Sequence, residues 1–354
     1  MVDGVVNCNN CGACEREVVF PPGVAQKHQI VRCMNCGLMY AYPRATANIA
    51  NYVAAGQTRE PMSLQTPEVI RSFDKLPDYE PIGLELRKLL PRGKALLEVG
   101  CHAGVLLDRF RGQGWNVSGV DPDSRAANFA SSHYRLDVKA STLEDAGYDS
   151  ATFDAVVMLH VIEHLDDPAG TVGVIARLLR PGGLLVVETP VYDTLMFRLL
   201  GRRERSLSCD GHIVFYTGGT LAALLERCGF EIVAQRRVGR TVSLGRLLWN
   251  IGVMSKSKTL QHMIERASNA LGLIHRGRLY LNTRDMVRIF ARKAGSSENH
   301  GDYRRARTLP SRATTTCGHE ATTPKSSAGD SAGRKLLNII KGDGSRFGRP
   351  AKAT

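Results

Sequence analysis

The chain has 354 residues, of which 43% are hydrophobic and 23% are charged. These proportions are ordinary for a soluble globular protein and exclude a wholly disordered, collagenous or fibrous chain. The formal net charge of +13 first suggests nucleic acid or an anionic membrane as a partner.

The positive charge lies almost wholly in the last third of the chain. Residues 235–295 carry 13 basic and 2 acidic side chains, and residues 296–354 carry 11 and 5, so residues 1–234 have a net charge of −4. A mildly acidic body of this size is not typical of a nucleic-acid-binding core. Nucleic acid is therefore not an expected partner.

The beginning of the chain is rich in cysteine. Five of the nine cysteines fall within the first 36 residues, which favours a metal site in a reducing compartment over a disulfide framework. No basic segment followed by an apolar stretch begins the chain, and no window of about 18 apolar residues occurs, so neither a targeting signal nor a spanning helix is expected. The expected location is the cytoplasm.

Residues 1–45 contain two turns of the form C-x-x-C-G. One holds Cys8 and Cys11 and the other holds Cys33 and Cys36. Two such turns supply four thiolates to one tetrahedral ion, so we predict a structural Zn²⁺ site, with an iron site or redox-active pairs as alternatives. Cys14 has the same spacing from Cys11 and is expected to be a free thiol.

The middle of the chain alternates between strand and helix signals. Residues 46–81 are interpreted as a linker with short helices, and the alternation runs over residues 82–238. This pattern indicates βαβ units, and therefore an α/β fold with a doubly wound parallel sheet. The predicted strands are 94–99, 115–120, 153–159, 184–188, 230–238 and 284–291, and the predicted helices are 103–111, 124–132, 168–179 and 220–228.

The basic last third contains two different segments. Residues 239–281 mix apolar and basic side chains at helical spacing and are predicted to be a helical insertion. Residues 296–354 are rich in small and basic residues without sustained periodicity, and they are predicted to be a disordered tail.

A glycine-containing turn follows the strand at 94–99. Gly100 and Gly104 let the backbone approach a ligand and leave helix N–H groups facing it. The next strand ends at Asp121, whose carboxylate can accept hydrogen bonds from both hydroxyls of a ribose. Neither G-x-G-x-x-G nor a phosphate-binding loop is present, so the turn is predicted to hold a nucleoside without a pyrophosphate.

Several blocks in this region resemble the class I S-adenosylmethionine-dependent methyltransferases. Glu98–Gly104 resembles their first motif, Val120-Asp-Pro their second, Phe153–Pro168 the block at the end of their fourth strand, and Leu178–Pro190 their fifth strand with its preceding turn. The first 45 residues are similar to the rubredoxin-like zinc ribbon that precedes some bacterial members. The resemblance implies a Rossmann-like seven-stranded sheet covering residues 82–295, including the insertion.

The resemblance also implies roles for individual residues. Gly100 and Gly104 would border the methionine part of S-adenosyl-L-methionine, with Glu98 ordering the turn. Asp121 would bind the ribose, and His160 would lie where cofactor and acceptor meet. His102 replaces the glycine that is usual in the middle of the first motif. The segment expected to flank the adenine is Thr142-Leu143-Glu144.

Three histidines are candidates for accepting a proton from the methyl acceptor. Histidine suits this role near neutral pH. His160 is the first choice, because it follows a strand at the edge where open α/β sheets bind ligands. His164 and His212 are further candidates, and a packing or substrate-positioning role is the alternative for all three.

The insertion at 239–281 has two interpretations. It is either a helical lid packed on the sheet or a surface for an anionic membrane or lipid-linked acceptor, which would make the protein peripheral to a membrane.

The sequence as a whole predicts a methyltransferase acting on a small molecule such as a sugar, glycolipid or secondary metabolite, with O-methylation favoured. A tRNA or protein methyltransferase and a non-catalytic nucleic-acid-binding protein are the alternatives.

Overall fold

The computed structural model describes residues 7–23, 28–43, 60–201, 207, 211–243 and 278–294. Within these ranges the chain forms a seven-stranded sheet and a four-stranded sheet. The predicted helical insertion lies outside the described residues between 244 and 277, and the predicted tail also lies outside them.

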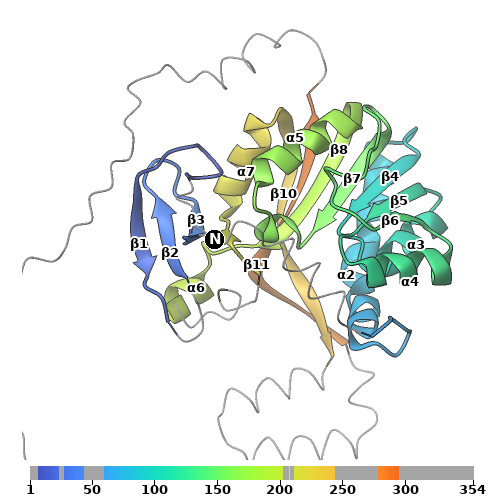
Figure 1. Ribbon diagram of the computed structural model, residues 1–354, viewed down its shortest axis with the longest axis horizontal. Helices are drawn as coiled ribbons and strands as arrows, with labels where there is room; N and C mark the ends of the chain where they lie inside the picture. Colours follow the sequence, from blue (N-terminus) through green and yellow to red (C-terminus); the bar gives the residue numbers. More distant parts are fainter. Residues whose placement is uncertain are drawn as a thin grey trace, which may run out of the picture. The chain divides into compact units, whose positions relative to one another are not determined.

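The seven-stranded sheet has the order β10-β11-β8-β7-β4-β5-β6 (Figure 1). Neighbouring strands from β8 to β6 are parallel, while β11 is antiparallel to both β8 and β10. This arrangement confirms the predicted doubly wound seven-stranded fold. The strands are β4 (Ala95–Val99), β5 (Asn116–Val120), β6 (Asp137–Lys139), β7 (Phe153–Leu159), β8 (Leu179–Pro190), β10 (Phe230–Ser243) and β11 (Arg278–Lys293).

Successive side chains of the central strands point into two separate apolar layers, as the period of a strand requires. Leu96 of β4 lies in the layer under α2, α3 and α4, whereas Leu97 lies in the layer under α5 and α7. Both leucines are fully buried. The helices are α2 (Pro67–Leu89), α3 (Val105–Gly112), α4 (Ser124–Tyr134), α5 (Pro168–Leu178), α6 (Leu195–Leu200) and α7 (Gly218–Arg227), with a short 3-10 turn η1 (Ile162–His164).

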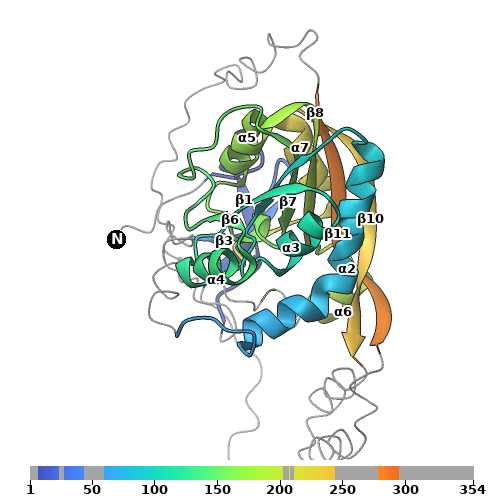
Figure 2. The same cartoon turned by 90° about the vertical axis from the view of Figure 1, so that its right-hand side faces the viewer.

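The segment expected to be a linker contains the first part of a long helix. Helix α2 has 23 residues and contains Pro77 and Pro81, which lack the N–H groups that a helix interior uses. It nevertheless forms because Val69, Ile82 and Leu86 are fully buried in the layer shared with α3. Figure 2 shows α2 running beside β10. The domain start expected at residue 82 therefore falls inside a helix.

The last two strands are longer than the sequence indicated. The expected ranges were 230–238 and 284–291, but β10 continues to Ser243 and β11 begins at Arg278, and the two pair almost throughout. The ends of the expected insertion at 239–281 are thus strand. None of the helices in the described part of the chain combines the length and apolar character that a membrane crossing requires.

The N-terminal sheet includes a strand from far along the chain. Its order is β1 (Arg16–Phe20), β2 (Gln29–Cys33), β3 (Met39–Tyr42) and β9 (Val214–Phe215), all antiparallel. Tyr40 of β3 is 2% exposed and lies in the same apolar cluster as Val156 of β7 and Leu224 of α7. The small sheet and the large domain therefore share one core.

This shared core makes a prediction about stability. Replacing Tyr40 by alanine should lower the free energy of unfolding by about 3–5 kcal/mol, because a buried ring is removed. The small sheet and the large domain should unfold together in one transition. Urea denaturation followed by intrinsic fluorescence measures this. Tyr40→Phe is the matched control and should lower the free energy of unfolding by no more than about 1.5 kcal/mol, because it keeps the buried ring and removes only the hydroxyl. An unchanged main transition in Tyr40→Ala would show that the small sheet unfolds independently.

Candidate active site

The candidate site lies at the carboxyl ends of β4, β5, β7 and β8. Strands β5 and β6 follow β4 on one side of it in the sheet. The chain then crosses back, and β7 and β8 lie on the other side of β4. Ligands of open α/β sheets bind where the strand order reverses in this way, because the loops after the adjacent strands diverge and leave a crevice.

The loop after β4 is built from residues with left-handed backbone. Gly100, His102 and Gly104 have φ angles of 74°, 47° and 72°. At Gly100 a Cβ atom would come within 2.4 Å of Val161 Cγ2, so a side chain there would displace the wall of the site. Histidine is among the residue types that tolerate this backbone region better than most, which explains how His102 can occupy a position where glycine is usual in the resembled motif.

Asp121 is tied to this glycine loop. It is 5% exposed, and its Oδ2 accepts a hydrogen bond from His102 N at 2.7 Å while Oδ1 accepts one from Asp123 N at 2.9 Å. Burial raises the pKa of Asp121 to about 6, although the two N–H donors oppose this shift. Each carboxylate oxygen can accept a second hydrogen bond, so this geometry is compatible with an additional hydroxyl ligand.

An apolar cavity of about 400 Å³ opens beside the loop. Thr142, Leu143 and Glu144, the residues expected to flank an adenine, all line it. A planar, weakly polar ring is the kind of group that such a lining accommodates. The apolar lining side chains are Val99, Val120, Pro122, Leu143, Val161, Leu165 and Val174.

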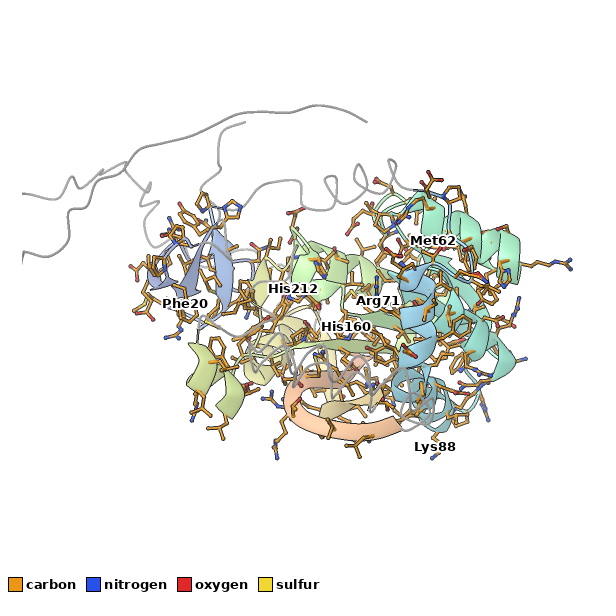
Figure 3. The ribbon with its side chains drawn as sticks, turned by 90° about the horizontal axis from the view of Figure 1, so that it is seen from below. Phe20, Met62, Arg71, Lys88, His160 and His212 are labelled. Carbon is orange, nitrogen blue, oxygen red and sulfur yellow. The ribbon has the colours of Figure 1, made fainter. Side chains whose placement is uncertain are left out.

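A second cavity, of about 240 Å³, lies on the other side of Gly100, which lines both. Glu98, His102 and His160 line it, together with Arg71 and other residues of helix α2. Figure 3 shows His160 between α2, which carries Arg71, and His212. The sequence-predicted residues on the two sides of the loop are thus brought together around one glycine.

Glu98 contributes a buried carboxylate to this second cavity. Its Oε2 has no hydrogen-bond partner in the described structure. Burial raises the pKa of Glu98 well above its ordinary range, and the nearby Asp121 adds to the shift. A buried polar atom without a partner is costly, so a ligand with a donor group would find an acceptor there.

His160 follows β7 and has a left-handed backbone, with φ of 57°. Its Nε2 lies 2.7 Å from Tyr79 Oη and 3.5 Å from Glu188 Oε1, and its Nδ1 lies 3.6 Å from Glu163 Oε1. Burial by itself would lower the pKa of His160, but the two carboxylates outweigh it and raise the pKa. The ring is therefore held beside the cavity with its charged form stabilised.

The residues around His160 were not found from the sequence. Tyr79 lies in α2, where a linker was expected, and Glu188 lies inside an apolar strand. Glu188 Oε2 accepts a hydrogen bond from Arg288 Nε at 2.7 Å, and Arg288 also donates to Asp78 O at 2.9 Å. The sequence did contain one signal for Glu188, namely a charged residue within an apolar strand. Such residues are rarely buried unless they are paired, so a partner could have been expected.

His164 and His212 meet on the other side of Glu163. Their ring centroids are 4.8 Å apart, and His212 Nε2 is 4.0 Å from Glu163 Oε1. His164 Nδ1 lies 2.8 Å from Gly211 O. All three predicted histidines thus gather around a buried glutamate that the sequence analysis had not considered.

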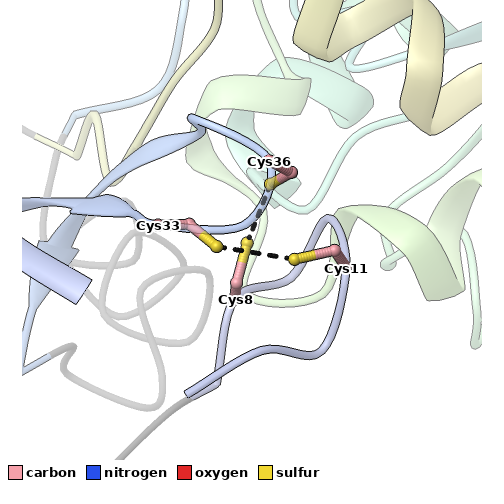
Figure 4. A group of neighbouring side chains, drawn as sticks. All are labelled: Cys8, Cys11, Cys33 and Cys36. Carbon is pink, nitrogen blue, oxygen red and sulfur yellow. Dashed lines mark hydrogen bonds between the residues drawn. The ribbon is translucent and has the colours of Figure 1, made fainter. Parts of the chain in front are cut away.

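The four cysteines predicted to bind metal also converge (Figure 4). Cys8 Sγ lies 3.5 Å from Cys36 Sγ, and Cys11 Sγ lies 3.5 Å from Cys33 Sγ. A tetrahedron with Zn–S bonds of about 2.3 Å has S–S edges of roughly 3.8 Å, so the cluster fits a zinc ion. Burial raises the pKa of Cys36 to about 11, and a bound cation would favour its thiolate form. Cys14 lies outside this set.

Hydrogen bonds join the cysteine turns to the larger domain. Asn9 Nδ2 donates to Asp166 O at 2.6 Å, and Asn10 Nδ2 donates to Thr220 O at 3.2 Å. Asp166 lines the apolar cavity. The first cysteine turn therefore supports one wall of the candidate site.

Residues 75–235 match a family described as "Methyltransferase domain". The match covers the glycine loop, Asp121 and the three histidines, and the seven-stranded topology agrees with it. This part of the chain is therefore similar to methyltransferase domains. The residues expected to contact S-adenosylmethionine thus lie within the matched region.

Among curated proteins, the chain is similar to the ubiquinone biosynthesis O-methyltransferases. It is 36% identical over 115 residues to the protein of Methylocella silvestris, covering 30% of this chain and 45% of that protein. It is 32% identical over 139 residues to the protein of Aromatoleum aromaticum, covering 36% and 59%. The chain thus spans about half the length of the curated relatives it matches.

Solved structures with this general fold are more distant. A Burkholderia thailandensis 1,6-didemethyltoxoflavin-N1-methyltransferase, solved with S-adenosylhomocysteine, is 16% identical with a TM-score of 0.45, covering 74% of this chain and 98% of that one. A SAM-dependent methyltransferase of Thermotoga maritima is 21% identical with a TM-score of 0.40, covering 61% and 88%.

Proposed function

We propose that this protein transfers a methyl group from S-adenosyl-L-methionine to a small-molecule acceptor. The observation that carries the proposal is the pair of cavities meeting at Gly100, within the region that matches the methyltransferase family. One cavity is apolar and the other is polar, as a cofactor with an adenine at one end and a charged amino acid at the other requires. The cofactor supplies an electrophilic methyl group on a sulfonium sulfur.

On this proposal each predicted cofactor residue has a defined task. Asp121 accepts hydrogen bonds from the ribose, while Thr142 and Leu143 contact the adenine. Glu98, Gly100 and Gly104 shape the part of the loop that faces the amino-acid end. His160 lies at the polar end of the site, beside the place where the methyl group would be transferred.

His160 is proposed to accept the proton that an oxygen acceptor loses when its lone pair attacks the methyl carbon. On this proposal the acceptor hydroxyl takes the place of the Tyr79 hydroxyl, which lies 2.7 Å from Nε2. The names of the curated relatives favour O-methylation. His164 and His212 are proposed to face the acceptor from the far side of Glu163.

The acceptor is proposed to enter near the carboxyl end of β10. Strand β10 runs parallel to β8, because both are antiparallel to β11, so its end lies at the same edge of the sheet as the site. Residues 244–277, which follow β10 in the sequence and lie outside the described residues, are proposed to contact the acceptor or an anionic membrane. Comparing metabolites between a deletion strain and its parent would identify the acceptor.

The cofactor role makes a prediction for Asp121. Replacing it by alanine should weaken binding of S-adenosylhomocysteine by roughly 10–100-fold, because hydrogen bonds to a charged group are lost. Isothermal titration calorimetry at pH 7.5 measures this. Asp137→Ala is the matched control, because Asp137 is an exposed carboxylate on the neighbouring strand β6, and it should bind normally. Absence of binding by the unmodified protein would instead favour a non-catalytic role.

The four cysteines are proposed to hold one structural Zn²⁺, which leaves no open position for chemistry. Purified protein treated with a weak chelator should retain about one tightly bound zinc per chain, measured by elemental analysis. Cys8→Ser should lose this zinc, while Cys14→Ser should keep it. Retention of the metal by Cys8→Ser, or iron in its place, would contradict the assignment.

A further inference from the structure

A second group of metal-binding side chain types lies beside the candidate active site. Glu163 and His164 belong to η1, and His212 precedes β9. One potential ligand atom from each of the three residues lies within 4.8 Å of the others. This group is separate from the four cysteines and borders His160, whose Nδ1 lies 3.6 Å from Glu163 Oε1.

Glu163 presents a buried oxygen to this group. Its side chain is 2% exposed, and Oε2 accepts a hydrogen bond from Thr189 Oγ1 at 2.9 Å. The other oxygen, Oε1, is buried, and it lies 3.6 Å from His160 Nδ1 and 4.0 Å from His212 Nε2. A buried carboxylate oxygen is costly unless it is compensated, and it is a natural ligand for a cation.

His164 has the hydrogen bond that orients a metal-binding histidine. Its Nδ1 lies 2.8 Å from Gly211 O. A carbonyl oxygen can only accept, so Nδ1 carries the proton, and in the neutral ring Nε2 is then the nitrogen that can coordinate. Metal-ligating histidines almost always donate their other ring N–H to a carbonyl or carboxylate in this way, which fixes the tautomer and the ring orientation.

His212 is held in place by the residue that follows it, because both the N–H and the C=O of Ile213 form backbone hydrogen bonds. Ile213 N donates to Glu163 O at 3.0 Å, and Ala41 N of β3 donates to Ile213 O at 2.9 Å. The N-terminal sheet and η1 therefore hold the third ring beside the other two groups. A preorganised set of this kind is what a metal site needs, because ligands must be held before the ion arrives.

We propose that Glu163, His164 and His212 bind one divalent transition-metal ion of the zinc class. Two histidines and one glutamate form a donor set typical of catalytic zinc, in which a position remains open for water or substrate. The ion would lie next to His160, so the open position suits an oxygen of the acceptor. This last step rests on the proposed methyltransferase function, whereas binding of the ion does not.

Cobalt(II) can report the site because its absorption depends on its ligands. We would titrate Co²⁺ into the full chain at pH 7.5 after about one equivalent of Zn²⁺ has been loaded into the four-cysteine site and more weakly bound Zn²⁺ has been removed with a chelator. The expected result is about one bound equivalent, with visible d–d bands and without the thiolate charge-transfer band in the near ultraviolet. Absence of saturable binding, or binding whose spectrum shows only the thiolate band, would overturn the proposal.

Single variants identify the ligands. Glu163→Gln and His164→Asn should each weaken Co²⁺ binding by at least about 100-fold, since even the loss of an outer-shell partner costs 10–100-fold. His133→Asn is the matched control, because His133 is exposed on α4, and it should bind normally. Binding that is unchanged in both ligand variants would overturn the proposal.

Binding of S-adenosylhomocysteine separates the failure of this proposal from the failure of the proposed function. Both ligand variants should retain it, which also shows that they fold. A protein that binds the nucleoside but shows no saturable Co²⁺ binding contradicts the metal site alone. A protein that binds Co²⁺ through these residues but not the nucleoside supports the metal site and contradicts the methyltransferase function.

Discussion

The buried carboxylate of Glu163 is the point on which the candidate site depends. Its side chain accepts a hydrogen bond from Thr189 of β8 and faces His160 and His212, and its backbone carbonyl accepts the hydrogen bond from Ile213. Through Ile213 the same residue is linked to the N-terminal sheet. A charge this deeply buried is tolerated only when surrounding groups compensate it. The strand ends, the histidines and the cysteine-rich sheet are therefore parts of one arrangement.

The cysteine-rich segment is part of the larger domain and not a separate unit. The sequence suggested a separate ribbon joined by a linker, but β3 pairs with β9 and Tyr40 is buried in the core of the larger domain. Asn9 and Asn10 also bond to the backbone of that domain. A metal held by the cysteines would stabilise the turn that carries these two asparagines. The structural role predicted for that metal thus extends to a wall of the apolar cavity.

The sequence predicted what local patterns determine. The strand, glycine turn and helix around Gly100 lie where they were expected, and the four cysteines converge because each C-x-x-C-G turn is a local structure. Helix α2 was missed because Pro77 and Pro81 argue against a helix, while burial of residues far apart in the fold outweighs that local cost. Strand β9 and the contacts of Tyr79 and Glu163 could not be predicted, because they arise only from pairings between distant segments. The net charge, in contrast, identified neither the fold nor the site.

The central claim is that a single nucleoside cofactor spans both cavities and meets His160. A crystal structure of the full chain with S-adenosylhomocysteine tests this most directly. The account predicts the adenine against Leu143 and Val161, the ribose on Asp121, and the sulfur on the side of Gly100 that faces His160. A nucleoside bound elsewhere, or one in the apolar cavity with its sulfur turned away from His160, would contradict it.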